Sequence, residues 1–189
     1  MIASPNGGYF IYDGDGSVFN VSGPPGSDHI EKTFEQYFVE AKIKSAPTEF
    51  DGRSDYGPFL DARIPAGGLD SGAEEIMTTE QAKWYAQFLT ILIQWSLPIF
   101  SLCYRWNGQA GIAYDKCYHQ ACDGINNLNV PAWVVSTKGA AHGIATYARS
   151  LKGIPRGPRA PAREVQATKL SYDQQGHLAC GSLHRTAIV

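Results

Sequence analysis

The sequence has no excess of basic charge and no serine-hydrolase signature. Its 16 Lys and Arg nearly balance 18 Asp and Glu, and the resulting net charge of -2 leaves no basic surface for nucleic acid. No Gly-x-Ser-x-Gly turn occurs, which excludes the common serine nucleophile. Gly67 and Gly68 are not followed by a phosphate-binding pattern. The first residues lack a basic segment before an apolar run, so we expect no signal peptide in this chain.

Metal-ligand patterns are also scarce. The segment from Asp13 to Ser17 begins like a calcium loop, but Val18 and Pro24 stand where that loop needs glycine and glutamate, so we expect a turn. No His-x-Asp pair is present. Four of the five histidines have no ligand spacing with the fifth, His119, and we expect them to be structural or exposed: His29, His142, His177 and His184.

The segment 117–123 is the most informative part of the chain. Cys117 and Cys122 flank His119, and Asp123 follows. Neutral imidazole is the commonest protein ligand for zinc. A disulfide between the two cysteines would close a tight loop and fix the direction of the ring, although the spacing alone does not establish the bridge. Asp123 is either an acceptor for a ring nitrogen or a helix cap.

The pattern of apolar residues predicts an α/β layer. We expect strands over residues 8–13 and 63–69, each ended by glycines. A helix is predicted over 28–43, with a capping box formed by Asp28 and Glu31 and an apolar face.

Two further helices are expected beyond these elements. Thr78 and Gln81 have the spacing of a second capping box. The closing helix is predicted over 131–150, and its apolar stripe is expected to comprise Trp133, Ala140, Ile144 and Tyr147.

Four other segments, together with 117–123, carry a family resemblance. In chain order, the five segments closely resemble the secreted zinc aminopeptidases of metallopeptidase family 28, with the fungal members nearest. The segments are residues 1–6, 50–59, 64–74, 108–115 and 117–123.

The resemblance implies a two-zinc exopeptidase that removes N-terminal residues from peptides and is secreted or vacuolar. It also implies an α/β/α sandwich with a mixed central sheet, of which this chain would hold the C-terminal part. Paired metals lower the pKa of a shared water and polarise the scissile carbonyl, while a glutamate acts as general base. His119 matches a zinc ligand. Tyr118 matches a residue that stabilises the oxyanion, or is only packed. Arg53 matches a residue near the substrate, or forms a surface ion pair with Asp51 or Asp55.

Only His119 matches the ligand set of the family, which comprises two histidines, two aspartates and a glutamate. The family pattern places one ligand aspartate immediately before the position of Met1, and the others further upstream. One histidine cannot hold a catalytic zinc, which needs about three protein ligands. We therefore expect this chain to be the C-terminal half of an aminopeptidase and inactive alone. The alternative is a non-enzymatic peptide-binding or regulatory module, with membrane attachment through residues 88–103 as one version.

Two segments depart from the peptidase region, which is expected over residues 1–150. Residues 85–107 form an apolar insert that is a transmembrane helix, an added buried element or, as the abrupt boundaries favour, a translated intron. Residues 151–189 are basic and rich in Pro and Gly, which predicts a flexible tail without an assigned partner. The paired cysteines indicate an oxidising compartment, where the tripeptide from Asn20 to Ser22 matches the glycosylation pattern, although that pattern is common by chance.

Overall fold

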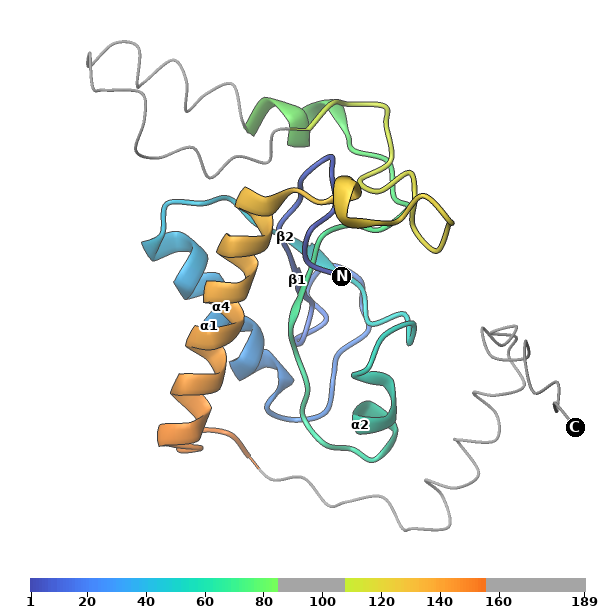
Figure 1. Ribbon diagram of the computed structural model, residues 1–189. Coiled ribbons are helices and arrows are strands. Elements are labelled where there is room, and N and C mark those ends of the chain that lie inside the picture. The colour runs from blue at the N-terminus through green and yellow to red at the C-terminus, as the bar shows by residue number, and fades with distance from the viewer. Residues whose placement is uncertain (85–107, 156–189) are drawn as a thin grey trace, which may run out of the picture.

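A small mixed sheet lies at the centre of the computed structural model, which describes residues 1–84 and 108–155 (Figure 1). The strand order is β2-β1-β3, with β1 at Phe10–Tyr12, β2 at Ala46–Thr48 and β3 at Leu69–Asp70. Strand β1 runs parallel to β2 and antiparallel to β3. The helices around this sheet make the described part an α/β structure with a mixed sheet, which confirms the predicted fold class.

Strand β1 is buried because its side chains are apolar on both faces. Phe10 and Ile11 of β1, and Tyr9 just before it, are each at most 3% exposed and lie in the main core cluster. The predicted strand over 63–69 starts later than expected, at Leu69. Arg63 adopts a left-handed φ of 55°, and the N–H groups of Arg63 and Ile64 donate to carbonyls of helix α2 (Gly57–Asp61). These residues therefore end a helix rather than begin a strand.

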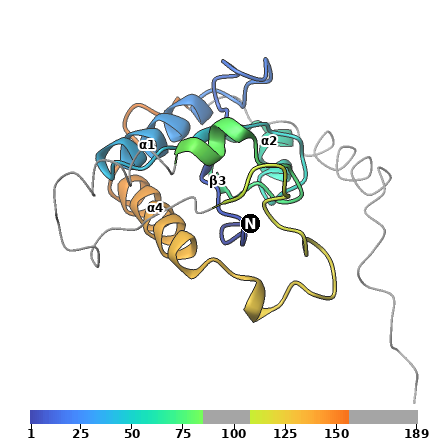
Figure 2. The same ribbon diagram turned by 90° about the horizontal axis from the view of Figure 1, so that it is seen from above.

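Helices α1 (Ser27–Glu40) and α4 (Val130–Arg149) pack side by side against one face of the sheet (Figures 1 and 2). Both predicted helices are confirmed, with α1 ending before Ile43. Large rings of α1 approach the backbone of α4 closely. A Cβ added to Gly143 would lie 2.9 Å from Phe34, and one added to Gly139 would lie 3.1 Å from Tyr37.

Two of the four residues of the predicted apolar stripe of α4 are exposed, whereas Ala140 and Tyr147 are half-buried and the Tyr147 hydroxyl hydrogen-bonds to Thr33 of α1. Trp133 and Ile144 are 45% and 71% exposed. Because aromatic residues of α1 fill the space between the helices, the inward face of α4 carries small residues and one valine. That face comprises Ala132, Val135, Ser136, Gly139 and Gly143.

One predicted capping box is confirmed and the other is wrong. The Thr78 N–H donates to Gln81, and the Gln81 N–H donates to the Thr78 hydroxyl, so that the helical residues 79–84 begin as expected. Helix α1 instead has Gly26 as its N-cap. The Glu31 side chain turns away from the helix start because it accepts hydrogen bonds from the N–H groups of Gly14 and Asp15.

The apolar insert at 85–107 and the tail from residue 156 lie outside the described residues. The membrane-attachment alternative for 88–103 therefore lies there too. Among the helices of residues 1–84 and 108–155, none combines the length and the apolar character that a membrane span requires.

Candidate functional site

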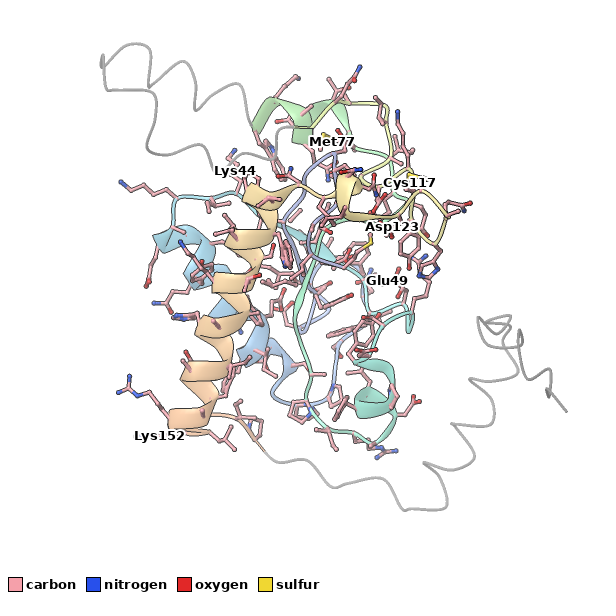
Figure 3. The ribbon with its side chains drawn as sticks, viewed as in Figure 1. Lys44, Glu49, Met77, Cys117, Asp123 and Lys152 are labelled. Atoms are coloured by element: carbon pink, nitrogen blue, oxygen red, sulfur yellow. A yellow bond between two sulfur atoms is a disulfide. The ribbon has the colours of Figure 1, made fainter. Side chains whose placement is uncertain are left out.

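A polar hollow of about 450 Å³ opens beside the disulfide loop. Arg53, Tyr118 and His119, which lie in two separate segments of the sequence, all line it. Glu49 and Asp123, labelled in Figure 3, line the same hollow from these two segments, and Met1 also borders it. The structure thus brings together the three side chains for which the sequence suggested a role.

The loop that carries His119 is held at several points. Cys117 and Cys122 form a disulfide, with their Cα atoms 5.3 Å apart. Asp115 is only 4% exposed, and its carboxylate accepts hydrogen bonds of 2.8 Å from the Cys117 N–H and from the Asn127 amide. The loop therefore has a covalent closure and an internal polar anchor.

His119 itself lies in an unusual backbone conformation. Its φ is 55°, in the left-handed region that few residues other than glycine adopt. Its exposed ring stacks on Tyr118 with 4.0 Å between ring centroids. Asp123 accepts a hydrogen bond of 3.2 Å from the Asn127 side chain, just before the short 3-10 helix at Ile125–Asn127.

Arg53 both lines the hollow and forms ion pairs. Its guanidinium bonds to Asp51, one of the two partners considered from the sequence, and to Glu74 instead of Asp55. Burial raises the pKa of the Asp51 carboxyl, but hydrogen bonds from the Arg53 backbone and side chain outweigh burial and leave that pKa below its ordinary value. Burial also raises the pKa of Glu74, but hydrogen bonds from its own backbone N–H and from the Arg53 side chain leave that pKa below its ordinary value. Arg53 therefore ties the segment after β2 to the segment after β3.

Aromatic side chains support the Asp51 end of this link. The Tyr56 hydroxyl donates to Asp51 at 2.8 Å and accepts from the Gly52 N–H at 2.9 Å. The Tyr56 ring packs edge-on against Tyr12 and Phe50. Burial, followed by the hydrogen bond to Asp51, raises the pKa of Tyr56, so its hydroxyl stays protonated and keeps donating.

Acidic groups dominate the lining of the hollow. Six carboxylates face a single guanidinium, that of Arg53; they belong to Glu49, Asp51, Asp55, Asp70, Glu75 and Asp123. Burial and the charge of Asp70 raise the pKa of Glu75. Burial, followed by the charge of Glu74, raises the pKa of Tyr118, so the Tyr118 hydroxyl carries its proton at neutral pH and can donate a hydrogen bond.

The residues around His119 do not by themselves form a zinc site. Within residues 1–84 and 108–155, the one group of three potential metal ligands comprises Asp13, Asp15 and Glu31, without His119. All three carboxylates, two from the loop after β1 and Glu31 from α1, accept backbone N–H groups of that loop. Catalytic zinc needs about three protein ligands, and His119 belongs to no such group among the described residues.

The other described histidines contact aromatic residues. The His29 ring shares a hydrogen bond of 3.0 Å with the Tyr147 hydroxyl, and the His142 ring lies 5.4 Å from the ring of Tyr37. His177 and His184 lie outside the described residues.

Comparison with known proteins identifies the family. The model of peptidase family M28 matches residues 1–143. The chain belongs to peptidase family M28. This finding confirms the resemblance seen in the sequence.

Several curated proteins similar to this chain are fungal. The chain is 47% identical over 156 residues to a probable leucine aminopeptidase 2 of Aspergillus oryzae, covering 82% of this chain and 27% of the relative. It is 42% identical over 179 residues to leucine aminopeptidase 2 of Trichophyton rubrum, covering 94% and 32%. It is 44% identical over 170 residues to a probable leucine aminopeptidase 2 of Aspergillus fumigatus, covering 90% and 29%. The chain thus spans about a third of the length of these relatives.

Sequence reasoning missed two residues of the site. Asp115 ends the family segment 108–115, and no local pattern there assigns a role to its buried carboxylate. Glu74 lies far from Arg53 in the sequence, and no local pattern pairs the two.

Proposed function

We propose that this M28 chain is part of a zinc-dependent aminopeptidase that removes N-terminal residues from peptides. The observation that carries the proposal is the meeting of Arg53, Tyr118 and His119 around one polar hollow. The names of the relatives, leucine aminopeptidases, agree with it.

Each of the three side chains has a proposed role. His119 is a ligand for one zinc ion, and the Cys117–Cys122 bridge holds its loop. The protonated Tyr118 hydroxyl donates a hydrogen bond to the oxyanion of the tetrahedral intermediate. Arg53, fixed by two carboxylates, lies along the bound peptide and shapes the wall of the hollow.

We also propose that this chain alone does not hydrolyse peptides, because His119 is a single ligand. Met1 borders the hollow, so polypeptide preceding it in a longer protein would enter beside His119 and could supply further ligands there. The disulfide supports a secreted or vacuolar location, since such bridges persist in oxidising compartments.

A second candidate is a peptide-binding module without catalysis. The incomplete ligand set at His119 favours it, because an acidic hollow can hold a peptide without any metal. The two candidates differ in whether added polypeptide and zinc create activity.

The test compares the 189-residue chain with a longer protein in which the preceding part of a fungal relative is joined to Met1. With zinc and leucine p-nitroanilide, we expect turnover only from the longer protein. In that protein His119→Gln should reduce kcat/KM by more than about 100-fold, since even residues that only orient metal ligands contribute 10- to 100-fold. Tyr118→Phe should lower kcat by about 100-fold.

The matched control is His142→Gln, which removes an exposed histidine of α4 and should leave turnover unchanged. Hydrolysis by the short chain would overturn the claim that it is inactive. An unchanged rate in the His119→Gln variant of the longer protein would overturn the role of His119. A longer protein that binds peptides without cleaving them would favour the second candidate.

A further inference from the structure

The loop after β1 presents an acceptor for covalent modification. Asn20, Val21 and Ser22 form the single Asn-x-Ser/Thr tripeptide among the 189 residues. Such a tripeptide is modified only where its asparagine can be reached by the glycosylating enzyme. The structure therefore has to show whether Asn20 is accessible.

The backbone before Asn20 is held by a buried anchor. Asp13 is fully buried, and its carboxylate accepts the N–H groups of Ser17, Val18 and Phe19 at 2.8–3.1 Å. Asn20 follows directly, with its own N–H donated to Gly16 at 3.0 Å. The hydrogen bonds to Asp13 and Gly16 thus fix the backbone of the turn as far as Asn20.

The side chain of Asn20 is exposed. Its φ of 59° is left-handed, a conformation that asparagine tolerates better than most residues. Within residues 1–84 and 108–155, its side-chain amide makes no hydrogen bond. The Nδ2 atom is therefore available for bond formation without breaking a structural contact in that part of the chain.

The surroundings of Asn20 fit a sugar chain. Three apolar side chains next to it are unusually exposed: Val18 at 55%, Phe19 at 37% and Val21 at 44%. A glycan is bulky and solubilising, and would shield them. Val21 and Ser22 border a second hollow of about 430 Å³, which shares no lining residue with the hollow beside His119. A glycan there therefore leaves the proposed peptide site open.

The disulfide gives independent support. The Cys117–Cys122 bridge is of a kind that forms in the oxidising lumen of the secretory pathway, where N-glycosylation also takes place. We propose that Asn20 carries an N-linked glycan. The inference rests on entry into that pathway and not on peptidase activity.

The transfer needs a lipid diphosphate-linked oligosaccharide as donor. Asn20 Nδ2 forms a bond to C1 of the terminal sugar and gives up one proton, which passes to solvent water. The bond between C1 and the diphosphate oxygen breaks, and the lipid diphosphate leaves with the electron pair. The Ser22 hydroxyl completes the recognised tripeptide.

The experiment uses the full chain, translated behind a secretory leader into microsomes, and analyses only the chains that are protected from added protease. We expect one glycan per chain, removed by peptide N-glycosidase with conversion of Asn20 to aspartate in the tryptic peptide. Asn20→Gln and Ser22→Ala should each abolish it, and Ser22→Thr should retain it. Because three substitutions probe the same tripeptide, a folding defect in one variant does not decide the result.

Gln166→Asn provides the matched control, since it creates a second acceptor tripeptide with Ala167 and Thr168. This variant should carry two glycans. A protected wild-type chain that remains unmodified would overturn the proposal, as would a glycan that persists in Asn20→Gln. Release of the Asn20 glycan should also increase binding of a hydrophobic dye more than release of the glycan at position 166 does. Equal increases would overturn the shielding role of the sugar.

Discussion

Two loops of this chain are organised around a buried aspartate but closed by different means. Asp13 directs the loop that ends at Asn20, and Asp115 directs the loop that carries His119. Asp13 is fully buried and accepts three backbone N–H groups, whereas Asp115 is 4% exposed and shares its loop with a disulfide. The Asp13 carboxylate thus accepts three backbone N–H groups in a loop without a disulfide, whereas the Asp115 carboxylate accepts one in a loop that also has a covalent bridge.

The two loops also differ in their surroundings. The Asp13 loop packs its anchor beneath the start of α1, where Glu31 reinforces it. The Asp115 loop lines the hollow through Tyr118, His119 and Asp123, and its residues 119–126 are exposed. A bridge is therefore expected to matter more in the second loop, and substitutions in both loops test that expectation.

Loss of the Asp13 carboxylate should have the largest effect. Asp13→Ala leaves three N–H groups without their acceptor and should lower the free energy of unfolding by about 3 kcal/mol. Urea unfolding followed by tryptophan fluorescence measures it. The control is Asp15→Ala, which removes an exposed carboxylate of the same loop and should cost less than about 1 kcal/mol. Equal costs for the two variants would show that burial of Asp13 is not what stabilises the loop.

Removal of the disulfide should come next. Replacing Cys117 and Cys122 by serine frees a short loop and should cost about 2 kcal/mol in the chain-entropy model. Reduction of the wild-type chain should give a similar loss in the same unfolding measurement. If removal of the disulfide lowers the free energy of unfolding more than Asp13→Ala does, the expected order of the two effects is wrong.

Loss of the Asp115 carboxylate should be smaller while the bridge is intact. We expect Asp115→Ala to cost about 1 kcal/mol in the oxidised chain and about 2 kcal/mol without the disulfide, because neighbouring contacts couple. A double-mutant cycle with the two serine substitutions measures the coupling. If the two costs simply add, the Asp115 carboxylate and the disulfide stabilise their loop independently, and the expected coupling between them is wrong.

The smallest expected effect is a pH dependence in the Asp13 loop. Burial raises the pKa of Glu31 above its ordinary 4.5, so the folded chain holds that proton more tightly than the unfolded chain. The associated stabilisation is complete below pH 4.5 and is lost as the pH rises through the raised pKa. The stability of the wild type relative to Glu31→Gln should therefore fall from pH 4 to pH 7, whereas Glu35→Gln serves as an exposed control. If the stability difference between the wild type and Glu31→Gln does not change with pH, the raised pKa of Glu31 is not the cause of a pH dependence.

Local patterns predicted the elements of the fold better than their faces. The apolar runs located β1, α1 and α4 because burial requires them wherever they pack. The pattern failed on the inward face of α4, where Gly139 and Gly143 are buried because rings of α1 take the space. That outcome depends on a neighbour far away in the sequence. The Asp28–Glu31 box failed for the same reason, since Glu31 serves the loop at Gly14.

The candidate site was predictable in its residues but not in its contacts. The family resemblance pointed to Arg53, Tyr118 and His119, and the structure places all three around one hollow. It could not give the pairing of Arg53 with Glu74, because that pairing depends on how two loops meet after folding. It also left Asp115 without a role.

The left-handed backbone at His119 has a thermodynamic consequence. A conformation of this kind costs on the order of 1 kcal/mol, and here the disulfide and Asp115 maintain it before anything binds. Because the loop is already ordered, binding of a ligand to the imidazole removes little further conformational entropy from the chain. Calorimetry should therefore show a less unfavourable entropy of binding for the oxidised chain than for the reduced chain.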